Sequence, residues 1–561
     1  MSNTVSNGSP FPMLPRDEGW KKLSIREKIG QTAVVVGSPG KFKTQYGSIE
    51  AYLEKYPVGG IFFFPGKLTG DRKDDRIENI REAVGEFRAA SRSPMLFVGD
   101  FEYGGGELDP TLCTMPYLMA LGATRSAELA AARGRAVGRE ARYMGIQWIF
   151  APCCDININP FNPLVNTRSV SDDPDLALRL LSAQIGGIQE EGVAACAKHF
   201  PGDGVDYRDQ HMCVTYNSLP MEQWRQIHGK VFQGLISAGV HSIMTGHIAL
   251  PDYQDPSEQA DGVYLPATLS RDLNIRLLKE EMGFNGVIVS DALCMGGFRG
   301  IYEPEVRGEI ECFKAGTDVV LWPSLEYFDA MERAIASGEI GMERLDDAVA
   351  RVWAMKERLG LFDSDYASVR ELSAEEKADG FAISEQIAEN SLTLLKDRRK
   401  QLPISPATTK KVLLAAITPH LETYGRMSVL RDELIQRGFD VTMQRNIEYE
   451  QVGWEDHFSH GYDLIIYAVS RVSHRPIGPP VCYADEAHSI WASLSHKRHQ
   501  SLVVMFGNPY LADDYFQAAD LVINAYADLP STLKAVARAI CGEIPFRGVS
   551  PIKLKTLGTR Q

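Results

Sequence analysis

Short runs of apolar residues, rich in β-branched and aromatic side chains, recur through the first two thirds of the chain. Continuous apolar runs of this length are typical of parallel strands buried on both faces, whereas a half-exposed sheet would show alternation. Eight runs fit this description: QTAVVVG (31–37), VGGIFFF (58–64), MLFVGD (95–100), WIFAPCCD (148–155), VAACAKHF (193–200), SIMTGHI (242–248), GVIVSD (286–291) and GTDVVLWP (316–323).

Amphipathic stretches separate these runs. They predict helices over residues 126–144, 175–190, 221–238 and 269–282. Eight strands that alternate with helices predict a (β/α)8 barrel of the TIM type, which we assign to residues 1–375.

A smaller α/β pattern follows the barrel. Helical sequence from 327 to 388 includes a predicted linker helix over 376–389, and a second domain over 390–561 comes after it. An open, doubly wound αβα sandwich is the predicted fold of that domain. No GxGxxG follows its first strand and no GxxxxGK[ST] occurs, so no nucleotide site is predicted there. Its expected strands lie within 390–404, 410–417, 439–444, 462–470, 501–507 and 520–526.

Composition and charge narrow the classes of partner. Apolar residues make up 44% of the 561 residues and charged residues 24%, as in globular proteins, and the net charge is −14. An acidic chain disfavours nucleic acid or an anionic membrane as its main partner, and no run reaches the roughly 18 apolar residues of a membrane helix. The N-terminal sequence shows no secretory signal, so we expect a cytoplasmic protein with reduced cysteines. Its oligomeric state is left open between monomer and homodimer.

Polar or ionisable residues end several of the predicted strands. They are Asp100, Asp155, Lys198 with His199, His247 and Asp291. Any one of these could simply cap the next helix, but a barrel gathers the C-terminal ends of its strands at one mouth, where active sites lie. The whole set therefore predicts an active site at that mouth.

Two of these strand ends lead into segments with distinctive chemistry. AKHFPGDGVDYRDQH (197–211) ends in Asp209 and His211, and an Asp two residues from a His can fix the ring tautomer and raise its basicity. Taken alone, most such pairs are surface or structural. GFNGVIVSDALCMGGF (283–298) places Asp291 at a strand terminus, where a carboxylate could act as a nucleophile or as a metal ligand.

Two further segments suggest ligand binding. NPLVNTRSVSDDP (162–174) presents Arg168, whose fork of donors suits sugar hydroxyls or a carboxylate. In LFVGDFEYGGG (96–106), Asp100 precedes a glycine-rich loop that permits close approach of a ligand.

Together these segments resemble the family 3 glycoside hydrolases, especially their β-N-acetylglucosaminidase branch. The resemblance runs from LSIREKIGQ (23–31) to IPFRGVSPIKL (544–554), with KHFPGDG and LPATLSRDLNIRLLKEEMGFNGVIVSDAL (265–293) as its most specific motifs. It implies a barrel followed by an αβα sandwich, a nucleophile at Asp291, and an acid/base dyad of Asp209 and His211. It also implies sugar-binding roles for Asp100, Arg168, Lys198, His199 and His247.

Three departures from the family pattern are visible. PGDG replaces the usual PGHG, so Asp203 stands where a histidine is common. DFEYGGG replaces DQEGGR and lacks the following arginine, and the acidic context of the dyad loop is also unusual. None of these changes removes the nucleophile or the dyad, and they bear on which sugar and leaving group are used.

The chemistry implied is retaining hydrolysis of a small β-linked carbohydrate through a covalent glycosyl-Asp291 intermediate. No metal or organic cofactor is required. Phosphorolysis is an alternative, because a neutral imidazole base repels phosphate less than a carboxylate would. A β-glucosidase of the same family is another, with Glu486 of the second domain as its acid. Separately, the loop 471–486 of that domain is the segment expected to border the active site, unless the domain merely supports the barrel. A non-enzymatic sugar-binding protein is a third, disfavoured because nucleophile and dyad are both present.

Overall fold

The computed structural model describes residues 15–64, 80–363, 370–446, 461–471, 482, 484–497 and 500–555. These residues form two compact units. The first comprises described residues of Met1–Cys113, Ala130–Asp155 and Leu181–Asp379, and the second those of Thr114–Leu129, Ile156–Leu180 and Gly380–Gln561. Because the second unit includes two segments from the first half of the sequence, the residue limits predicted for the domains stay a prediction.

Parallel strands form the centre of the first unit, and each of the eight predicted apolar runs contains one. Their order is β12-β1-β2-β3-β4 in a five-stranded sheet and β11-β7-β5 in a three-stranded sheet. Isolated parallel bridges join Trp148 to Ala194 and Val289 to Val319, so β4 is linked to β5 and β11 to β12. The strands are β1 (Ala33–Val36), β2 (Gly60–Phe62), β3 (Leu96–Gly99), β4 (Trp148–Ile149), β5 (Cys196–Phe200), β7 (Ser242–Thr245), β11 (Val287–Ser290) and β12 (Val320–Leu321).

Helices alternate with these strands, as the amphipathic stretches predict. The first begins with a capping box, in which the Ser24 hydroxyl accepts the Glu27 N–H and the Glu27 carboxylate accepts the Ser24 N–H. The α-helices are α1 (Ile25–Gln31), α2 (Pro39–Tyr46), α3 (Ile49–Lys55), α4 (Ile80–Ala90), α5 (Leu118–Thr124), α6 (Ala127–Met144), α7 (Pro174–Glu190), α8 (Met221–Gln226), α9 (His228–Ser237), α10 (Gly296–Arg299), α11 (Glu305–Lys314), α12 (Tyr327–Ala336) and α13 (Met342–Arg358).

Two of the predicted helices differ from the structure. The stretch 221–238 is two helices, α8 and α9, that meet at Ile227. Side chains on both sides of the break are tied to one loop, because the Trp224 indole N–H donates to the Pro201 carbonyl and the His228 ring donates to the Asp203 carbonyl. The stretch 269–282 contains a π-helix over Asp272–Glu281.

A six-stranded sheet is the core of the second unit, in the order β13-β18-β17-β16-β14-β15. All neighbours are parallel except β13, which runs antiparallel to β18. Each expected strand segment coincides with one of them, although β15 extends one residue past 439–444. They are β13 (Thr393–Asp397), β14 (Lys411–Ile417), β15 (Asp440–Arg445), β16 (Leu464–Val469), β17 (Ser501–Met505) and β18 (Leu521–Asn524).

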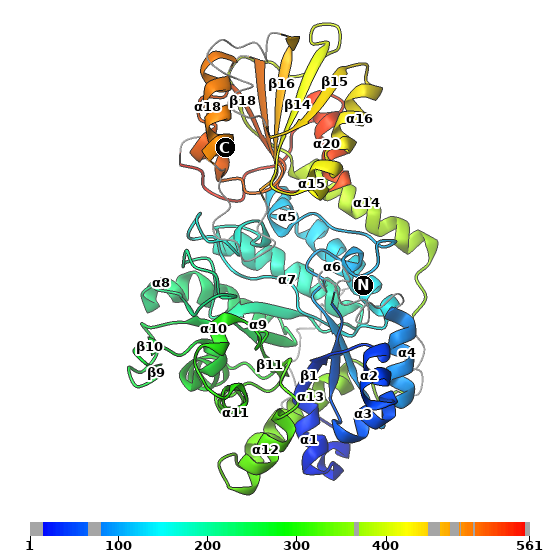
Figure 1. The fold of residues 1–561 in the computed structure, drawn as a ribbon, viewed down its shortest axis with the longest axis vertical. Helices are drawn as coiled ribbons and strands as arrows, with labels where there is room; N and C mark the ends of the chain where they lie inside the picture. Colours follow the sequence, from blue (N-terminus) through cyan, green and yellow to red (C-terminus); the bar gives the residue numbers. More distant parts are fainter. Residues whose placement is uncertain are drawn as a thin grey trace, which may run out of the picture. The chain divides into compact units, whose positions relative to one another are not determined.

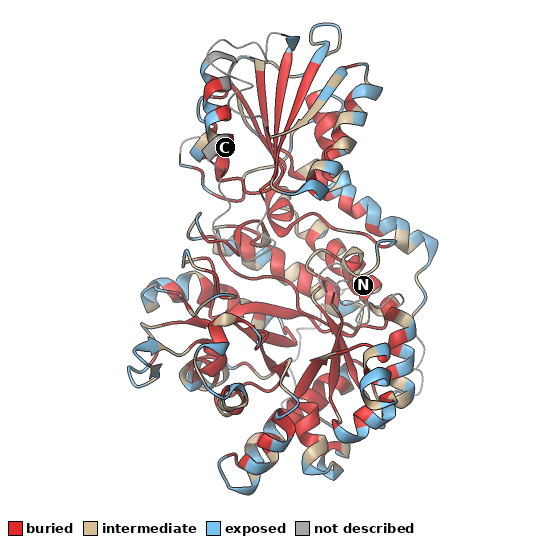
Figure 2. Ribbon diagram, viewed as in Figure 1, coloured by how far each residue is buried: buried red, intermediate tan, exposed pale blue. Residues whose placement is uncertain are grey.

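Helices cover both faces of this sheet (Figure 1). Leu414 and Ile466 pack in one apolar cluster with α16 (Ser428–Gln436) and α20 (Pro530–Ile540), while their neighbours Leu413 and Ile465 pack in another with α18 (Ala484–Lys497) and α19 (Leu511–Tyr515). Successive strand residues therefore point to opposite faces, as in a sheet buried on both sides. Figure 2 shows the central strands buried and the outer faces of the helices exposed, while the edge strand β15 is only partly covered. The unit also contains α15 (Leu421–Arg426) and the part of α14 (Ala374–Ser391) from Gly380 onward.

No helix among the described residues combines the length and the apolar character needed to span a bilayer.

Candidate active site

The polar strand ends of the first unit are connected by close contacts. Lys198 Nζ lies 3.4 Å from Asp100 Oδ1, so the ends of β5 and β3 meet. His199 Nδ1 lies 2.8 Å from Asp155 Oδ2, beyond the end of β4, and His199 Nε2 lies 3.8 Å from Asp291 Oδ2, after β11. The strand-end residues expected to share one mouth are therefore brought together across four strands.

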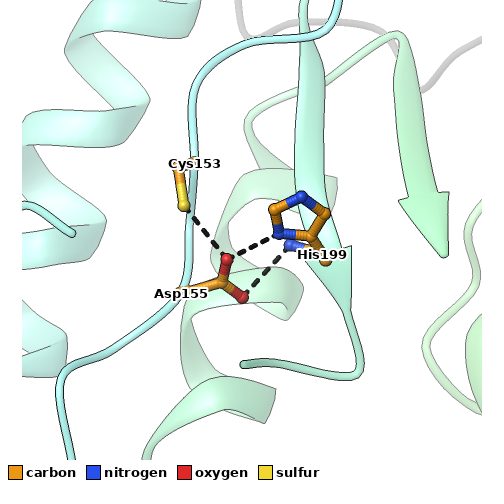
Figure 3. Close-up of side chains that lie close together, drawn as sticks. All are labelled: Cys153, Asp155 and His199. Atoms are coloured by element: carbon orange, nitrogen blue, oxygen red, sulfur yellow. Dashed lines mark hydrogen bonds and ion pairs between the residues drawn. The ribbon is translucent and has the colours of Figure 1, made fainter. Parts of the chain in front are cut away.

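Asp155 holds His199 through both of its carboxylate oxygens (Figure 3). Oδ2 accepts from the His199 ring and from the Cys153 thiol at 3.0 Å, while Oδ1 accepts the backbone N–H of His199 at 3.1 Å and of Asp203 at 2.7 Å. Burial would raise the pKa of Asp155, but the His199 charge and these hydrogen bonds hold it well below the usual range. Because Nδ1 faces Asp155, Nε2 is left facing Asp291.

The Asp291 carboxylate is fixed by its strand and kept ionised by its surroundings. Strands β11 and β7 run in register up to Ser290 beside Thr245, and the Asp291 N–H donates to the Thr245 carbonyl at 2.9 Å. Oδ1 accepts the Ala292 N–H at 2.7 Å. Burial alone would raise the pKa of Asp291, but the electrostatic interaction with His199, and to a smaller extent with two other histidines, brings it below its usual value.

The predicted dyad is formed. His211 Nδ1 lies 2.7 Å from Asp209 Oδ1, and the same oxygen accepts the His211 backbone N–H at 2.9 Å. The Asp209 side chain is buried, whereas the His211 side chain is 37% exposed. Since the Gly296 N–H donates to the His211 carbonyl at 2.7 Å, the dyad loop is attached to the segment that follows Asp291.

Lys198 is buried between two carboxylates. Its Nζ lies 2.7 Å from Glu102 Oε1, closer than to Asp100, and the Glu102 carbonyl accepts from the buried Arg133 guanidinium at 2.8 Å. Glu140 secures the glycine-rich loop by accepting the N–H groups of Gly105 and Cys113. Burial raises the pKa of Glu140 to about 7.

His247 is buried, and both of its ring nitrogens have partners in the protein. Nε2 lies 3.1 Å from the Ala292 carbonyl, so it carries the proton, and Nδ1 accepts from the Thr268 hydroxyl at 3.0 Å. Burial holds the pKa of His247 below its usual value. The ring thus supports the backbone beside Asp291, and its predicted contact with sugar stays a prediction.

Arg168 belongs to the second unit, where it ends a short 3₁₀ turn, Asn166–Arg168, and donates to the Leu164 carbonyl. Its predicted contact with the substrate therefore stays a prediction. Asp203, at the unusual PGDG position, is buried and structural: its carboxylate accepts from the Gly204 N–H and from the Gln210 amide.

Glu486 is buried and forms an ion pair with Arg471 in the second unit. Most of the loop between these two residues lies outside the described residues. The Glu486 side chain is therefore already engaged within its own unit, and its predicted role as the acid stays a prediction.

Cys153, Asp155 and His199 are the one group of possible metal ligands found among the described residues, with ligand atoms within 4.8 Å of one another. The spacing of these three residues in the sequence did not predict that they would form such a group. Direct hydrogen bonds join the three groups, so their arrangement is already explained by the positioning of His199. Glu102 was also missed, although the family pattern DQEGGR has a glutamate at the same place as DFEYGGG.

A buried, ionised carboxylate at a strand end, beside a histidine held by its own aspartate, defines an enzyme of nucleophilic and acid–base catalysis. Residues 24–355 match the profile of the glycosyl hydrolase family 3 N-terminal domain. The chain therefore belongs to glycoside hydrolase family 3 and is a glycosidase, as its motifs predict.

Several similar proteins span most or nearly all of the chain. A β-N-acetylglucosaminidase/β-glucosidase of Cellulomonas fimi is 32% identical over 489 residues, 84% of this chain and 85% of that protein. The structure of β-glucoside phosphorylase BglX is similar with a TM-score of 0.82 and 26% identity, covering 96% of this chain and 95% of the other. The structure of a family 3 β-N-acetylglucosaminidase from Paenibacillus sp. FPU-7 is similar with a TM-score of 0.79 and 27% identity. The match covers 96% of this chain and 100% of the other.

Replacing Asp155 by asparagine tests its positioning of His199. The amide side chain keeps the size and one acceptor but lacks the charge, so we expect kcat/KM on a nitrophenyl β-glycoside to fall by about 10- to 100-fold. The ring of His199, whose interaction lowers the pKa of Asp291, would also be held less firmly beside Asp291, so the pKa of Asp291 should rise. The acidic limb of the kcat/KM–pH profile, where Asp291 is protonated, should therefore move to higher pH.

Cys153→Ser is the matched control, because a hydroxyl still donates to Asp155 and should leave the limb in place. A folded Asp155→Asn enzyme with the parent's acidic limb would contradict this role.

Proposed function

We propose that this protein is a retaining, exo-acting β-glycosidase, with β-N-acetylglucosaminides as its principal substrates. Asp291 is the nucleophile, and His211, held by Asp209, is the acid/base. The observation that carries the proposal is the buried Asp291 carboxylate with its lowered pKa, which faces His199 at 3.8 Å. A nucleophile must be anionic before it attacks, and this environment keeps it so.

In the first step Asp291 attacks the anomeric carbon while the bond to the leaving oxygen breaks. The His211 imidazolium gives its Nε2 proton to that oxygen, and Asp209 stabilises the positive charge of the ring before transfer. The products are the free aglycone, a neutral His211 and an α-linked glycosyl ester on Asp291.

In the second step water attacks the same carbon from the other face. Neutral His211 takes a proton from the water, the ester bond breaks, and Asp291 leaves as a carboxylate. The sugar is released with its β-configuration retained, and His211 is again an imidazolium. Asp100, Lys198 and His199 are the proposed sugar-binding residues of the first unit, with Arg168 and His247 as further candidates.

The fold proposed for this chemistry is a closed (β/α)8 barrel followed by an αβα sandwich, within limits of 1–375 and 390–561. Support comes from the bridges that link β4 to β5 and β11 to β12, and from the helices on both faces of the six-stranded sheet. The preference for an acetamido sugar rests on the names of two of the relatives.

Asp291→Ala should lower kcat/KM by about a thousandfold or more, because a covalent step is deleted and no packing is lost. The rate is measured on a panel of nitrophenyl sugars, in which the N-acetylglucosaminide should be the best substrate of the parent. Added azide should restore turnover and give the α-glycosyl azide, since it attacks from the face that Asp291 vacates.

Near-parental turnover in the folded variant would remove Asp291 from this role. A parent that prefers the glucoside would make the protein a β-glucosidase.

His211→Ala should show a strong dependence on the leaving group. A methyl glycoside, which needs protonation, should lose about 10²- to 10⁴-fold in kcat/KM, whereas a dinitrophenyl glycoside should lose little. Azide should now give the β-glycosyl azide, because it attacks the α-linked intermediate. Glu486→Ala is the comparison: if it shows this dependence and His211→Ala does not, the acid belongs to the second domain.

Phosphorolysis is the second candidate, favoured by the BglX phosphorylase among the similar structures and by a base that is neutral when the acceptor enters. Turnover with phosphate would release glycosyl phosphate in place of free sugar. We expect hydrolysis to dominate, because Arg208 beside the dyad is bound to Asp206 at 2.6 Å. The test measures the ratio of glycosyl phosphate to free sugar as the phosphate concentration is raised in 10-fold steps. If most of the product is glycosyl phosphate, the protein is a phosphorylase.

A further inference from the structure

A cavity of about 400 Å³ in the first unit lies against the dyad loop. The loop contributes Met212 and Tyr216 to its wall, and a hairpin contributes Val263 and Tyr264. The walls are mainly apolar and aromatic. Met212 is 67% exposed and Val263 is 41% exposed, and large apolar side chains exposed together around a hollow mark a binding surface.

The hairpin that forms one wall is a defined structure. Strands β9 (Gln259–Ala260) and β10 (Val263–Tyr264) pair antiparallel, with Tyr264 opposite Gln259. The turn between them has positive φ at both Asp261 (51°) and Gly262 (80°), which suits a two-residue hairpin turn. Because its backbone is paired and its turn is favourable, the hairpin can present side chains at fixed positions.

Glu258 anchors the base of this hairpin. Its carbonyl accepts the Leu265 N–H, and its carboxylate accepts from the Asp272 N–H and the Ser270 hydroxyl. The wall is therefore built into the unit before any ligand arrives, which lowers the cost of ordering it on binding.

The charged side chains of the cavity disfavour an anionic ligand, because its lining cation is already paired and the carboxyl-bearing Asp261 also lines it. That cation is Arg208, whose guanidinium is held by both oxygens of Asp206 and stacks over the Tyr216 ring at 5.2 Å. A guanidinium paired in this way has its charge balanced and presents a flat face. Aromatic and aliphatic walls around a flat surface suit an uncharged ring with an apolar face.

The cavity is adjacent to the proposed acid/base. Arg208 and Met212, on either side of His211 in the sequence, both line it. Gly296 lines it too, and its N–H binds the His211 carbonyl at 2.7 Å. The oxygen of the leaving group must lie beside His211 to take its proton. The rest of the leaving group can then lie in this adjacent cavity.

We propose that this cavity is the leaving-group subsite, that it takes an uncharged ring such as a pyranose or an aryl group, and that Tyr264 and Val263 determine this preference. The proposal rests on the function proposed above and deepens it. Neither residue belongs to the catalytic machinery, so changes there should alter only the choice of leaving group.

The test compares kcat/KM on three substrates that share the preferred sugar: a nitrophenyl glycoside, a disaccharide and a methyl glycoside. This parameter covers all steps up to departure of the leaving group, so slow hydrolysis of the intermediate does not hide the effect. Tyr264→Ala should lose about tenfold on the ring-bearing substrates and less than twofold on the methyl glycoside, a loss in the usual range for one pocket contact.

Val263→Asp gives a second variant, which should lose similarly because it replaces an apolar part of the wall by an unpaired carboxylate. Gln259→Ala is the matched control on the same hairpin, exposed and outside the cavity lining, and should behave as the parent. Loss on only the nitrophenyl arm assigns the pocket to aryl groups, and loss on only the disaccharide assigns it to sugars.

Equal losses on all three substrates, or no loss in folded variants of both residues, would overturn the subsite. A parent that turns over none of the three would instead overturn the proposed function, and this inference with it.

Discussion

Asp155 is the buried carboxylate on which the geometry of the site depends. It lies beyond the end of β4, yet it binds the ring and the backbone of His199 at the end of β5 and the backbone of Asp203 in the following loop. Buried carboxylates are tolerated only when paired and fully hydrogen-bonded, and this one is. Through it, the position and the charge of His199 are set, and through His199 the ionisation of Asp291.

The site divides its charges by function. At the proposed sugar-binding residues, Lys198 is balanced by Asp100 and Glu102, so the cation is held in place by two anions. At the proposed leaving-group subsite, Arg208 is paired with Asp206 and the cavity wall is mainly apolar. The proposed nucleophile can therefore stay ionised, while the neighbouring cavity suits an uncharged ring.

Much of this could be predicted from the sequence, because burial on both faces leaves a continuous apolar run and a parallel strand ends where the run ends. That rule located Asp100, Asp155, Lys198, His199 and Asp291, whereas the Asp209–His211 dyad was predicted from the resemblance to the family motif and not from its spacing alone. The partners of Asp155 could not be predicted, since Asp203 and His199 are more than 40 residues away in the chain.

Periodicity also failed where distant side chains decide the backbone. The helix expected over 221–238 is broken at Ile227, where Trp224 and His228 are both anchored to the loop 201–203. Glu486 shows the converse, because a glutamate near a helix start gives no sign in the sequence of the buried pair that it forms with Arg471.

The covalent intermediate on Asp291 is the central claim, and its direct test is to trap it. A fluorinated β-glycoside of the preferred sugar with a good leaving group forms the ester but hydrolyses it slowly, so intact mass followed by peptide mapping can locate the label. The account predicts a mass increase of one glycosyl residue, carried by a peptide that contains Asp291 and absent in Asp291→Ala. A label on another carboxylate, or turnover with inversion and no label at all, would contradict it.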